Sequence, residues 1–309
     1  MSLRRLTAEA QTSDLKASDD QVDLTERLVK PLMPELVAAI GRARERTNAH
    51  FSLSASTLAL SISPEVAGDS NLSIYPIGFC AAIRDRVYAE LAREPCIRSL
   101  KAAGVLFNRV FIVLKNAYFQ NAIQLGNLYI DAANDTVDPG KHWLEWMPIP
   151  EVQYQNVDSW PQLANVAERY YRCRVFPNFC FPLLAPLVPL LAIRDNGRLD
   201  LLYFQNIFFL KDLAEGLPRL TSWLSSEDPI LSRQLPAACQ QTLVSSFGGN
   251  DFHSFPFEYR PSRPQEILVH AREIVAAANN PAQEQLVLKL LDLAPQAVKI
   301  LRQRAICAI

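Results

Sequence analysis

Two apolar segments separated by a carboxamide-rich stretch constrain the fold of this chain more than any other feature. Residues 110–114 form an apolar run long enough to be a buried strand. Further on, Leu128, Ile130 and Ala132 alternate with three other side chains. Alternation with a period of two is typical of a strand that packs one face inward. We therefore expect a sheet around this part of the chain.

Glycine is scarce, with 10 residues in a chain of 309. Phosphate-binding loops and dinucleotide-binding folds need clustered glycines, because only glycine lets the backbone approach the phosphates closely. Neither a GxGxxG nor a GxxxxGK[ST] motif occurs. We therefore expect no Rossmann or P-loop domain and no nucleotide cofactor.

Helical and strand-like patterns surround the central segments. Apolar residues that recur every three or four positions predict helices over residues 22–40, with a break at its prolines, over 77–93 and over 97–103. Residues 51–62 alternate instead with one phase shift, which predicts either one strand with a bulge or two short strands. Helices that cover such strands give an α+β fold with a mostly antiparallel sheet.

The C-terminal third changes from a hairpin to helices. Asp195-Asn196-Gly197 joins two apolar runs and predicts a hairpin, because a type I′ turn needs positive φ at two positions. Periodic apolar residues predict four helices after it, over residues 210–224, 229–247, 265–278 and 282–304. The last helix is unusually apolar, so it is either a core helix or the contact of a homo-oligomer.

Composition divides the chain into three parts. Residues 1–20 are polar and offer few large apolar groups to bury, so we expect a disordered tail. A proline-bounded connection after Met147 separates an α+β part, residues 21–150, from a part that contains the hairpin and the C-terminal helices, residues 151–309. The alternative is one continuous domain.

Charge and hydropathy limit the classes of partner. The 31 basic and 32 acidic residues give a net charge of -1, which provides no electrostatic reason to expect nucleic acid. No apolar run reaches the roughly 18 residues of a membrane span, and the N-terminus lacks the apolar segment of a secretory signal. We expect a cytoplasmic protein that does not bind membranes and whose scattered cysteines are reduced. Cys80 and Cys173 occupy positions that would lower the pKa of a thiol.

The first candidate site is the acidic end of the central stretch. It contains oxygen and imidazole groups within fifteen residues: Asp131, Asp135, Asp138, His142 and Glu145. Divalent cations bind convergent carboxylates, and transition metals also bind imidazole. The spacing matches neither a calcium loop nor HExxH, however. The alternative is a surface turn in which the Asp side chains accept hydrogen bonds from nearby backbone amides.

The second candidate site consists of carboxamides interleaved with aromatic residues. A buried amide without a partner costs about 1–3 kcal/mol, so these groups form either an internal network or a polar mouth. Arg260, in the separate segment 248–270, is a further candidate, because guanidinium groups bind carboxylate and phosphate; the alternative is an ordinary protein interface. The candidate ligand-binding residues are Asn116, Gln120, Asn121, Gln124 and Arg260.

A third candidate site lies in the segment 248–270. Asp251 and His253 would point the same way on an extended strand, and His270 follows on the next predicted helix. Two imidazoles and one carboxylate suit a non-haem iron centre. The alternative is an ordinary loop, since the order is Asp-x-His and no series of short strands surrounds it.

Two classes of function follow from these patterns. The first is a binding or accessory protein whose Asn-, Gln- and aromatic-rich surface binds a protein partner or a small molecule. The second is a metal-dependent enzyme, similar to a non-haem iron oxygenase or a hydrolase, with a carboxylate and histidine site and a divalent metal cofactor. We favour the first, because 4 histidines, 10 glycines and no cofactor motif leave little for catalysis.

Overall fold

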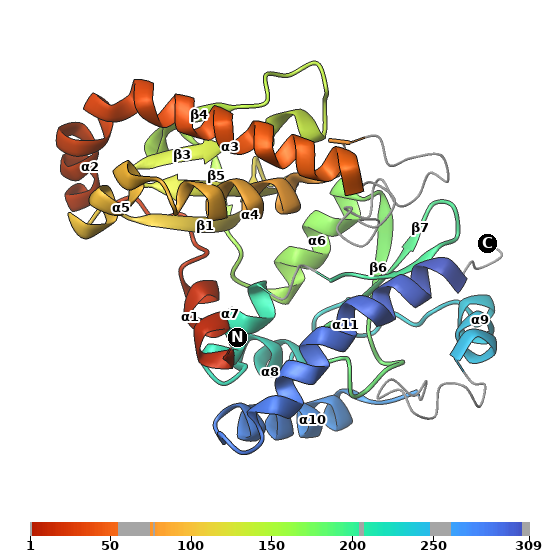
Figure 1. The fold of residues 1–309 in the computed structure, drawn as a ribbon. Coiled ribbons are helices and arrows are strands. Elements are labelled where there is room, and N and C mark those ends of the chain that lie inside the picture. Colours follow the sequence, from red (N-terminus) through yellow and green to blue (C-terminus); the bar gives the residue numbers. More distant parts are fainter. Residues whose placement is uncertain (1, 55–74, 77, 204–206, 248–260, 305–309) are drawn as a thin grey trace. The chain divides into compact units, whose positions relative to one another are not determined.

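The computed structural model describes residues 2–54, 75–76, 78–203, 207–247 and 261–304 (Figure 1). The chain forms two compact units, which we describe separately. The N-terminal unit is Thr12–Asn156, and the C-terminal unit combines Met1–Gln11 with Val157–Ile309. The first helix of the chain therefore belongs to the C-terminal unit.

A five-stranded antiparallel sheet forms the centre of the N-terminal unit, in the order β4-β3-β2-β1-β5. The strands are β1 (Phe107–Leu114), β2 (Tyr118–Leu125), β3 (Leu128–Asp131), β4 (Glu145–Pro148) and β5 (Tyr154–Asn156). The sequence predicted β1 and β3 but not β2, because its carboxamides suggested a polar connection. The turn between β1 and β2 contains Lys115 and Asn116, and both have positive φ.

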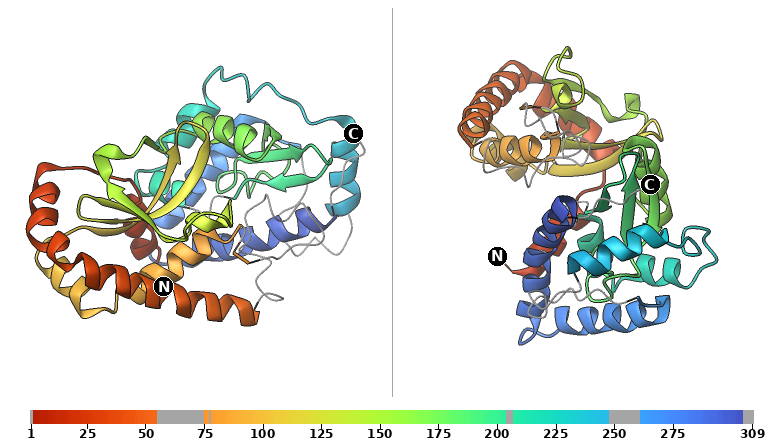
Figure 2. Two further views of the ribbon diagram at one scale, coloured as in Figure 1. Left: turned by 90° about the horizontal axis from the view of Figure 1, so that it is seen from above. Right: turned by 90° about the vertical axis from the view of Figure 1, so that its right-hand side faces the viewer.

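Helices pack on one face of this sheet. They are α2 (Asp19–Leu24), α3 (Met33–Ser54), α4 (Cys80–Leu91) and α5 (Pro95–Ala102). Figures 1 and 2 show α3 and α4 on the same side of the strands. Ile40 of α3 and Val87 of α4 are buried in one core with Ile123 of β2. This arrangement, with the helices of the C-terminal unit, confirms the predicted α+β fold.

The helix over residues 51–54 contradicts the predicted strand there. Residues 51–54 are the last turn of α3, and residues 55–62 lie outside the described chain. Phe51 continues a helical stripe with Ala43 and Thr47, all three of them buried. Its ring packs against Tyr75 and Phe79, with centroids 5.8 and 5.5 Å away. The buried helical stripe therefore determines the local structure, and the alternation of residue types does not.

The break that the prolines predicted before α3 takes the form of a π turn and a 3-10 turn over residues 25–32.

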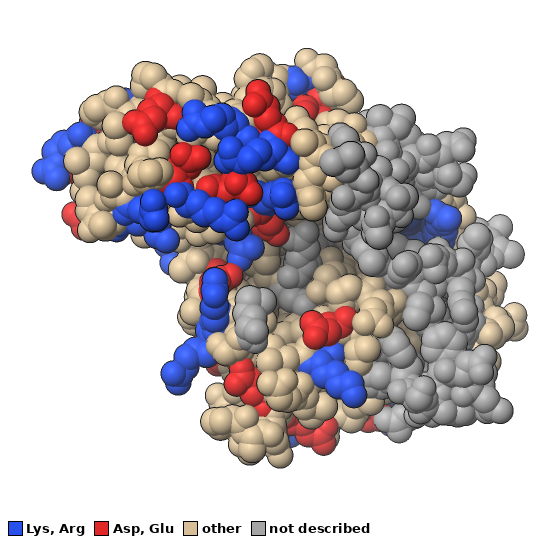
Figure 3. All heavy atoms as spheres, in the orientation of Figure 1, with Lys and Arg blue, Asp and Glu red and all other residues tan. Residues whose placement is uncertain are grey.

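Charged side chains of both signs cover the outer surface of these helices (Figure 3). Arg46 of α3 binds Glu90 of α4 at 3.0 Å, and Arg42 lies 3.6 Å from Glu94. Exposed pairs of this kind contribute only about 0–1 kcal/mol each. Positive and negative charges are therefore interspersed on this surface, which is not a patch of one sign.

The C-terminal unit contains a three-stranded antiparallel sheet of β6 (Cys173–Pro177), β7 (Leu190–Arg194) and β8 (Leu199–Leu201). The β7–β8 hairpin confirms the one predicted from Asp195-Asn196-Gly197. Its turn is not the predicted type I′, because only Gly197 has positive φ, 77°. The loop is three residues long and ends in a left-handed glycine, which is the next most common hairpin geometry.

The helices of the C-terminal unit are α1 (Leu3–Gln11), α6 (Trp160–Tyr170), α7 (Ile207–Ala214), α8 (Pro218–Leu224), α9 (Ala237–Phe247), α10 (Pro264–Ala278) and α11 (Glu284–Arg304). The helix predicted over residues 210–224 is divided into α7 and α8 at Gly216 and Leu217, which both have positive φ. None of the helices in the described ranges has the length and apolarity to cross a bilayer.

Helix α1 shows that the expectation of a disordered tail was wrong. Leu3 and Ala10 are buried, and α1 contacts α7 and α11. The Leu3 amide donates a hydrogen bond to the Glu284 side chain at the start of α11. Leu15, which follows α1, is buried in the N-terminal unit. Three of the few apolar residues of this segment, Leu3, Ala10 and Leu15, are therefore used for packing.

The apolar stripe of α11 is part of its own unit's core. Val287, Leu291, Ala294 and Val298 are at most 7% exposed. Among the described side chains of α11, only Leu286 is an exposed large apolar residue. These contacts favour the core helix over the oligomer contact, which stays a prediction.

We predict that Asp212→Ala lowers the free energy of unfolding by about 2–3 kcal/mol. The fully buried Asp212 carboxylate accepts hydrogen bonds from the first amides of α8, Arg219 N–H and Leu220 N–H, both at 2.9 Å. Urea unfolding followed by circular dichroism measures the loss. Glu215→Gln is the control, because Glu215 binds the Arg219 side chain at the surface. Equal effects of the two variants would contradict this role of Asp212.

Candidate functional site

Asp131 and Glu145 are the two acidic residues of the first candidate site that the fold brings opposite each other. They are register partners on β3 and β4. Asp131 is 3% exposed, its Oδ1 accepts a hydrogen bond from Ala133 N–H at 2.8 Å, and Gln120 donates to its Oδ2. Burial raises the pKa of Asp131 to about 7, although both hydrogen bonds act in the opposite direction.

Asp135 serves as the partner of a buried arginine. Arg44 of α3 donates two hydrogen bonds to the Asp135 carboxylate, at 3.0 and 2.8 Å, and a third to the Ala132 carbonyl at 2.6 Å. The Arg44 side chain is 4% exposed. Asp135 therefore attaches the segment after β3 to α3 and is committed to a structural ion pair.

Asp138 and His142 lie in an exposed loop. Asp138 Oδ1 accepts a hydrogen bond from Gly140 N–H at 2.9 Å, as the surface-turn alternative predicted. His142 Nδ1 lies 2.9 Å from the Leu144 carbonyl of its own loop. Within the part of the chain that the structure describes, no three His, Cys, Asp or Glu side chains are placed to hold a metal ion.

The carboxamides of β2 form an internal network. Gln124 is fully buried and donates to the Lys16 carbonyl at 2.6 Å and to the Gly126 carbonyl at 2.8 Å. Its oxygen accepts a hydrogen bond from Lys16 N–H at 3.1 Å. Asn121, also buried, donates to Cys80 Sγ at 3.4 Å. Gln124 therefore holds the chain before α2 against the sheet, and Asn121 links β2 to the start of α4.

The other predicted residues are dispersed or lie outside the described chain. Asn116 is exposed in the turn between β1 and β2. Asp251, His253 and Arg260 lie outside the described residues. His270 is on α10, where its Nδ1 lies 2.9 Å from a carboxylate oxygen of Glu273, one turn away.

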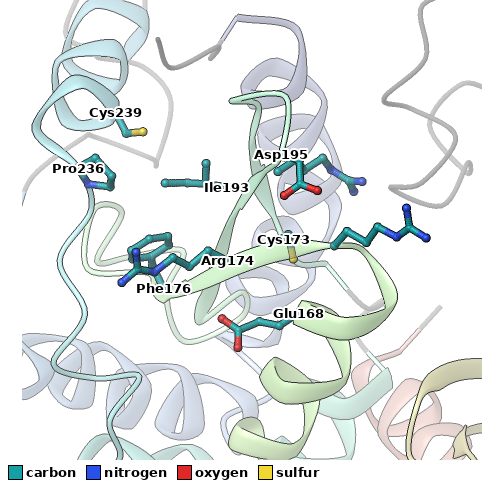
Figure 4. Close-up of a pocket in the computed structure, with 10 residues that line it drawn as sticks. Glu168, Cys173, Arg174, Phe176, Ile193, Asp195, Pro236 and Cys239 are labelled. Carbon is teal, nitrogen blue, oxygen red and sulfur yellow. The ribbon is translucent and has the colours of Figure 1, made fainter. Parts of the chain in front are cut away.

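The C-terminal unit contains a pocket of about 600 Å³ that the sequence did not predict (Figure 4). It lies where the end of α6, the strands β6 and β7, the turn after β7 and the start of α9 meet. The lining residues are Glu168, Arg172, Cys173, Arg174, Phe176, Ile193, Arg194, Asp195, Pro236 and Cys239.

One wall of the pocket combines a cation with apolar surface. Arg174 and Phe176 share a face of β6, because alternate residues of a strand point the same way. Ile193 is the register partner of Arg174. The Arg174 guanidinium carbon lies 5.5 Å from the centre of the Phe176 ring. Figure 4 shows Arg174 extended along this ring, with Pro236 on the same side.

Two further charged residues of the lining are already paired. Arg194 binds the buried Asp200 carboxylate at 3.1 Å. Glu168 forms an ion pair with Arg233 and accepts a hydrogen bond from Val175 N–H at 2.9 Å.

Two guanidinium groups of the lining are not neutralised. Arg172 and Arg174 are exposed, and neither has a carboxylate partner among the described residues. Arg172 is held at the end of α6 in a left-handed conformation, with φ 47°. The pocket therefore offers two uncommitted guanidinium groups beside apolar surface.

The cysteines of the lining do not supply a thiolate. Burial raises the pKa of Cys173 to about 12, although Arg194 lies close enough to lower it. The Cys173 thiol donates a hydrogen bond to the Ala167 carbonyl at 3.4 Å. The prediction of a lowered pKa at this position was wrong, because burial outweighs the neighbouring charge. Cys239 is disulfide-bonded, contrary to the expectation that the cysteines are reduced, whereas Cys80, Cys96, Cys173 and Cys180 are reduced thiols, as expected.

Comparison of the chain with protein-family models, with curated proteins and with solved structures found no match.

Proposed function

We propose that this protein is a binding protein and that the pocket of its C-terminal unit holds a small anionic ligand. The observation that supports this most is the pair of uncommitted guanidinium groups, Arg172 and Arg174, beside an apolar wall. Guanidinium groups bind carboxylate and phosphate through parallel N–H donors. A volume of about 600 Å³ is typical of small-molecule sites, which measure about 300–1,000 Å³.

The start of α9 borders the pocket. Pro236 precedes this helix and Cys239 is in its first turn, and both line the pocket. The first amides of a helix carry partial positive charge and favour anions. In this proposal the anionic group of the ligand binds Arg172 and Arg174, and its apolar part contacts the apolar atoms of the lining.

This proposal moves the ligand site away from the carboxamide-rich strands, because Gln124 and Asn121 are used inside the N-terminal unit. A protein partner and a cytoplasmic location stay predictions from the sequence. The alternative is a metal-dependent enzyme. Within the described ranges no three His, Cys, Asp or Glu side chains are placed to hold a metal ion, so no such cluster supports this alternative.

Isothermal titration calorimetry of the full chain tests the proposal with 3-phenylpropionate and phenyl phosphate. The uncharged 3-phenylpropanamide is the matched probe. We expect at least one anion to bind ten-fold or more tightly than the amide, since a hydrogen bond to a charged group contributes about 1.5–3 kcal/mol. The variant Arg172→Ala/Arg174→Ala should bind that anion no better than the amide.

Arg272→Ala is the control, because Arg272 is an exposed arginine on α10 that does not line the pocket. This variant should bind the anions as the unmodified protein does. Absence of binding by both anions, or unchanged binding after loss of Arg172 and Arg174, would contradict an anion site in this pocket.

A further inference from the structure

Cys80 is the first residue of helix α4, which packs against β1 and β2 in the N-terminal unit. The cysteine is half-buried, so small molecules reach its sulfur. Asn121 of β2, which is 8% exposed, donates a hydrogen bond from its Nδ2 to Cys80 Sγ at 3.4 Å. The first amides of a helix carry partial positive charge and stabilise a thiolate. The sulfur therefore lies among groups that favour a negative charge.

A buried cation lies one turn further along α4. Arg84 is 1% exposed and shares a helix face with Cys80, because residues four apart are neighbours on a helix. Its Nη1 donates to the Val110 carbonyl of β1 at 2.8 Å, whereas its buried Nη2 has no hydrogen-bond partner among the described residues. Burial lowers the pKa of Arg84, and negative charges on Asp85 and Cys80 act in the opposite direction. A thiolate on Cys80 thus stabilises the guanidinium charge.

The carboxylate of Asp85 compensates this cation only in part. Its Oδ1 lies 2.7 Å from Arg84 Nε and 3.3 Å from Arg109 Nη1 of β1, so two guanidinium groups share one oxygen. The Asp85 side chain is 37% exposed, and water screens its charge. The Arg84 guanidinium is buried and gains more from a second negative charge close by, which Cys80 supplies when it ionises.

We infer that Cys80 is a modification site whose sulfur is a thiolate at neutral pH and is oxidised by small hydroperoxides. Arg84, Asn121 and the first turn of α4 hold the negative charge on the sulfur. The half-buried position favours a reactant as small as hydrogen peroxide. The site belongs to the N-terminal unit, so the inference is independent of the pocket in the C-terminal unit.

The oxidation needs the thiolate, because the thiol form is a weak nucleophile. The Cys80 sulfur attacks one oxygen of the peroxide, and an S–O bond forms as the O–O bond breaks. The sulfur gives up two electrons and becomes a sulfenic acid. The peroxide accepts these electrons, and its second oxygen leaves as hydroxide, which takes a proton from the solvent.

Cys96 is the matched control in the same unit. It also lies in the first turn of a helix, α5, but its neighbour is the acidic Glu35. Burial and the Glu35 charge raise the pKa of the Cys96 thiol. A comparison of the two cysteines therefore separates the effect of the surroundings from that of a position in the first turn of a helix.

The pH dependence of alkylation by iodoacetamide, followed for each cysteine peptide of the full chain by mass spectrometry, tests the thiolate. We expect the midpoint for Cys80 at least about one pH unit below the ordinary value of about 8.5, and that for Cys96 above it. Arg84→Met should raise the Cys80 midpoint, and Arg84→Lys, which keeps the charge, should raise it less. Asn121→Asp is nearly isosteric and should also raise it, which keeps the test valid if Arg84→Met does not fold.

Hydrogen peroxide followed by dimedone, which reacts with sulfenic acids, tests the oxidation. Cys80 should be labelled at least about ten-fold more than Cys96, and Cys80→Ser should lose this label. A Cys80 midpoint at or above about 8.5, or one that Asn121→Asp leaves unchanged, would overturn the stabilised thiolate. Equal labelling of Cys80 and Cys96, or no labelling of either, would overturn Cys80 as the site that hydroperoxides oxidise.

Discussion

Arg44→Met is expected to lower the free energy of unfolding of the N-terminal unit by about 3–5 kcal/mol, the range for removal of one member of a buried ion pair. The Arg44 side chain is 4% exposed and that of Asp135 is 16% exposed. The variant leaves the Asp135 carboxylate without its cation and the Ala132 carbonyl without its donor at 2.6 Å. Methionine fills a similar apolar volume, so the loss reports mainly on charge and hydrogen bonds.

Urea unfolding followed by circular dichroism measures this loss. Because the chain has two compact units, hydrogen exchange of peptides from β3 should assign the loss to the N-terminal unit. Arg46→Met is the matched control, two residues along the same helix, because the Arg46 side chain is 45% exposed in its pair with Glu90. Its expected loss is about 0–1 kcal/mol.

A double variant distinguishes the charge from the packing. Asp135→Asn added to Arg44→Met removes the uncompensated carboxylate and should restore part of the lost stability. Two results would argue against a buried ion pair: no restoration, or an Arg44→Met effect as small as that of Arg46→Met.

The parts of the fold that depend on local pattern were predictable from the sequence. Asp195-Asn196-Gly197 specified a hairpin through the conformational freedom of glycine, and residues 77–93 specified α4 through their period. Elements that depend on distant partners were missed. Helix α1 has few apolar residues, and its burial depends on α7 and α11, both of which lie far away in the chain; Leu3 and its partner Glu284 at the start of α11 are 281 residues apart.

The partners of the candidate site residues could not be predicted for a related reason. The spacing of Asp131, Asp135 and His142 suggested convergence, but Arg44, 91 residues from Asp135, takes that carboxylate. Gln124 similarly finds its partners 108 residues away at Lys16. The pocket depends on the register that places Arg174 opposite Ile193. The arginines on both sides of Cys173 were its one visible signal, but local sequence does not reveal strand register.

The stability of the N-terminal unit is expected to fall as the pH rises through 7, and Asp131→Asn should remove this dependence. Asp131 has a pKa of about 7 in the folded protein against an ordinary value of 3.8. Between these values the folded state keeps a proton that the unfolded state has released. The contribution of the protonated group is therefore fully present below pH 3.8 and is lost as the pH rises through 7. The full shift of the Asp131 pKa corresponds to about 4 kcal/mol of unfolding free energy.

Urea unfolding at pH 5.5 and pH 8.5 samples about 2 kcal/mol of this difference, because each pH unit below the folded pKa contributes about 1.4 kcal/mol. Between pH 5.5 and pH 8.5, the unfolding free energy of Asp131→Asn should therefore rise by about 2 kcal/mol relative to that of the unmodified protein. Asp138→Asn, in the exposed turn, should follow the unmodified protein. Parallel pH curves for Asp131→Asn and the unmodified protein would contradict the prediction. They would mean that the hydrogen bonds from Ala133 and Gln120 offset the burial of the carboxylate completely.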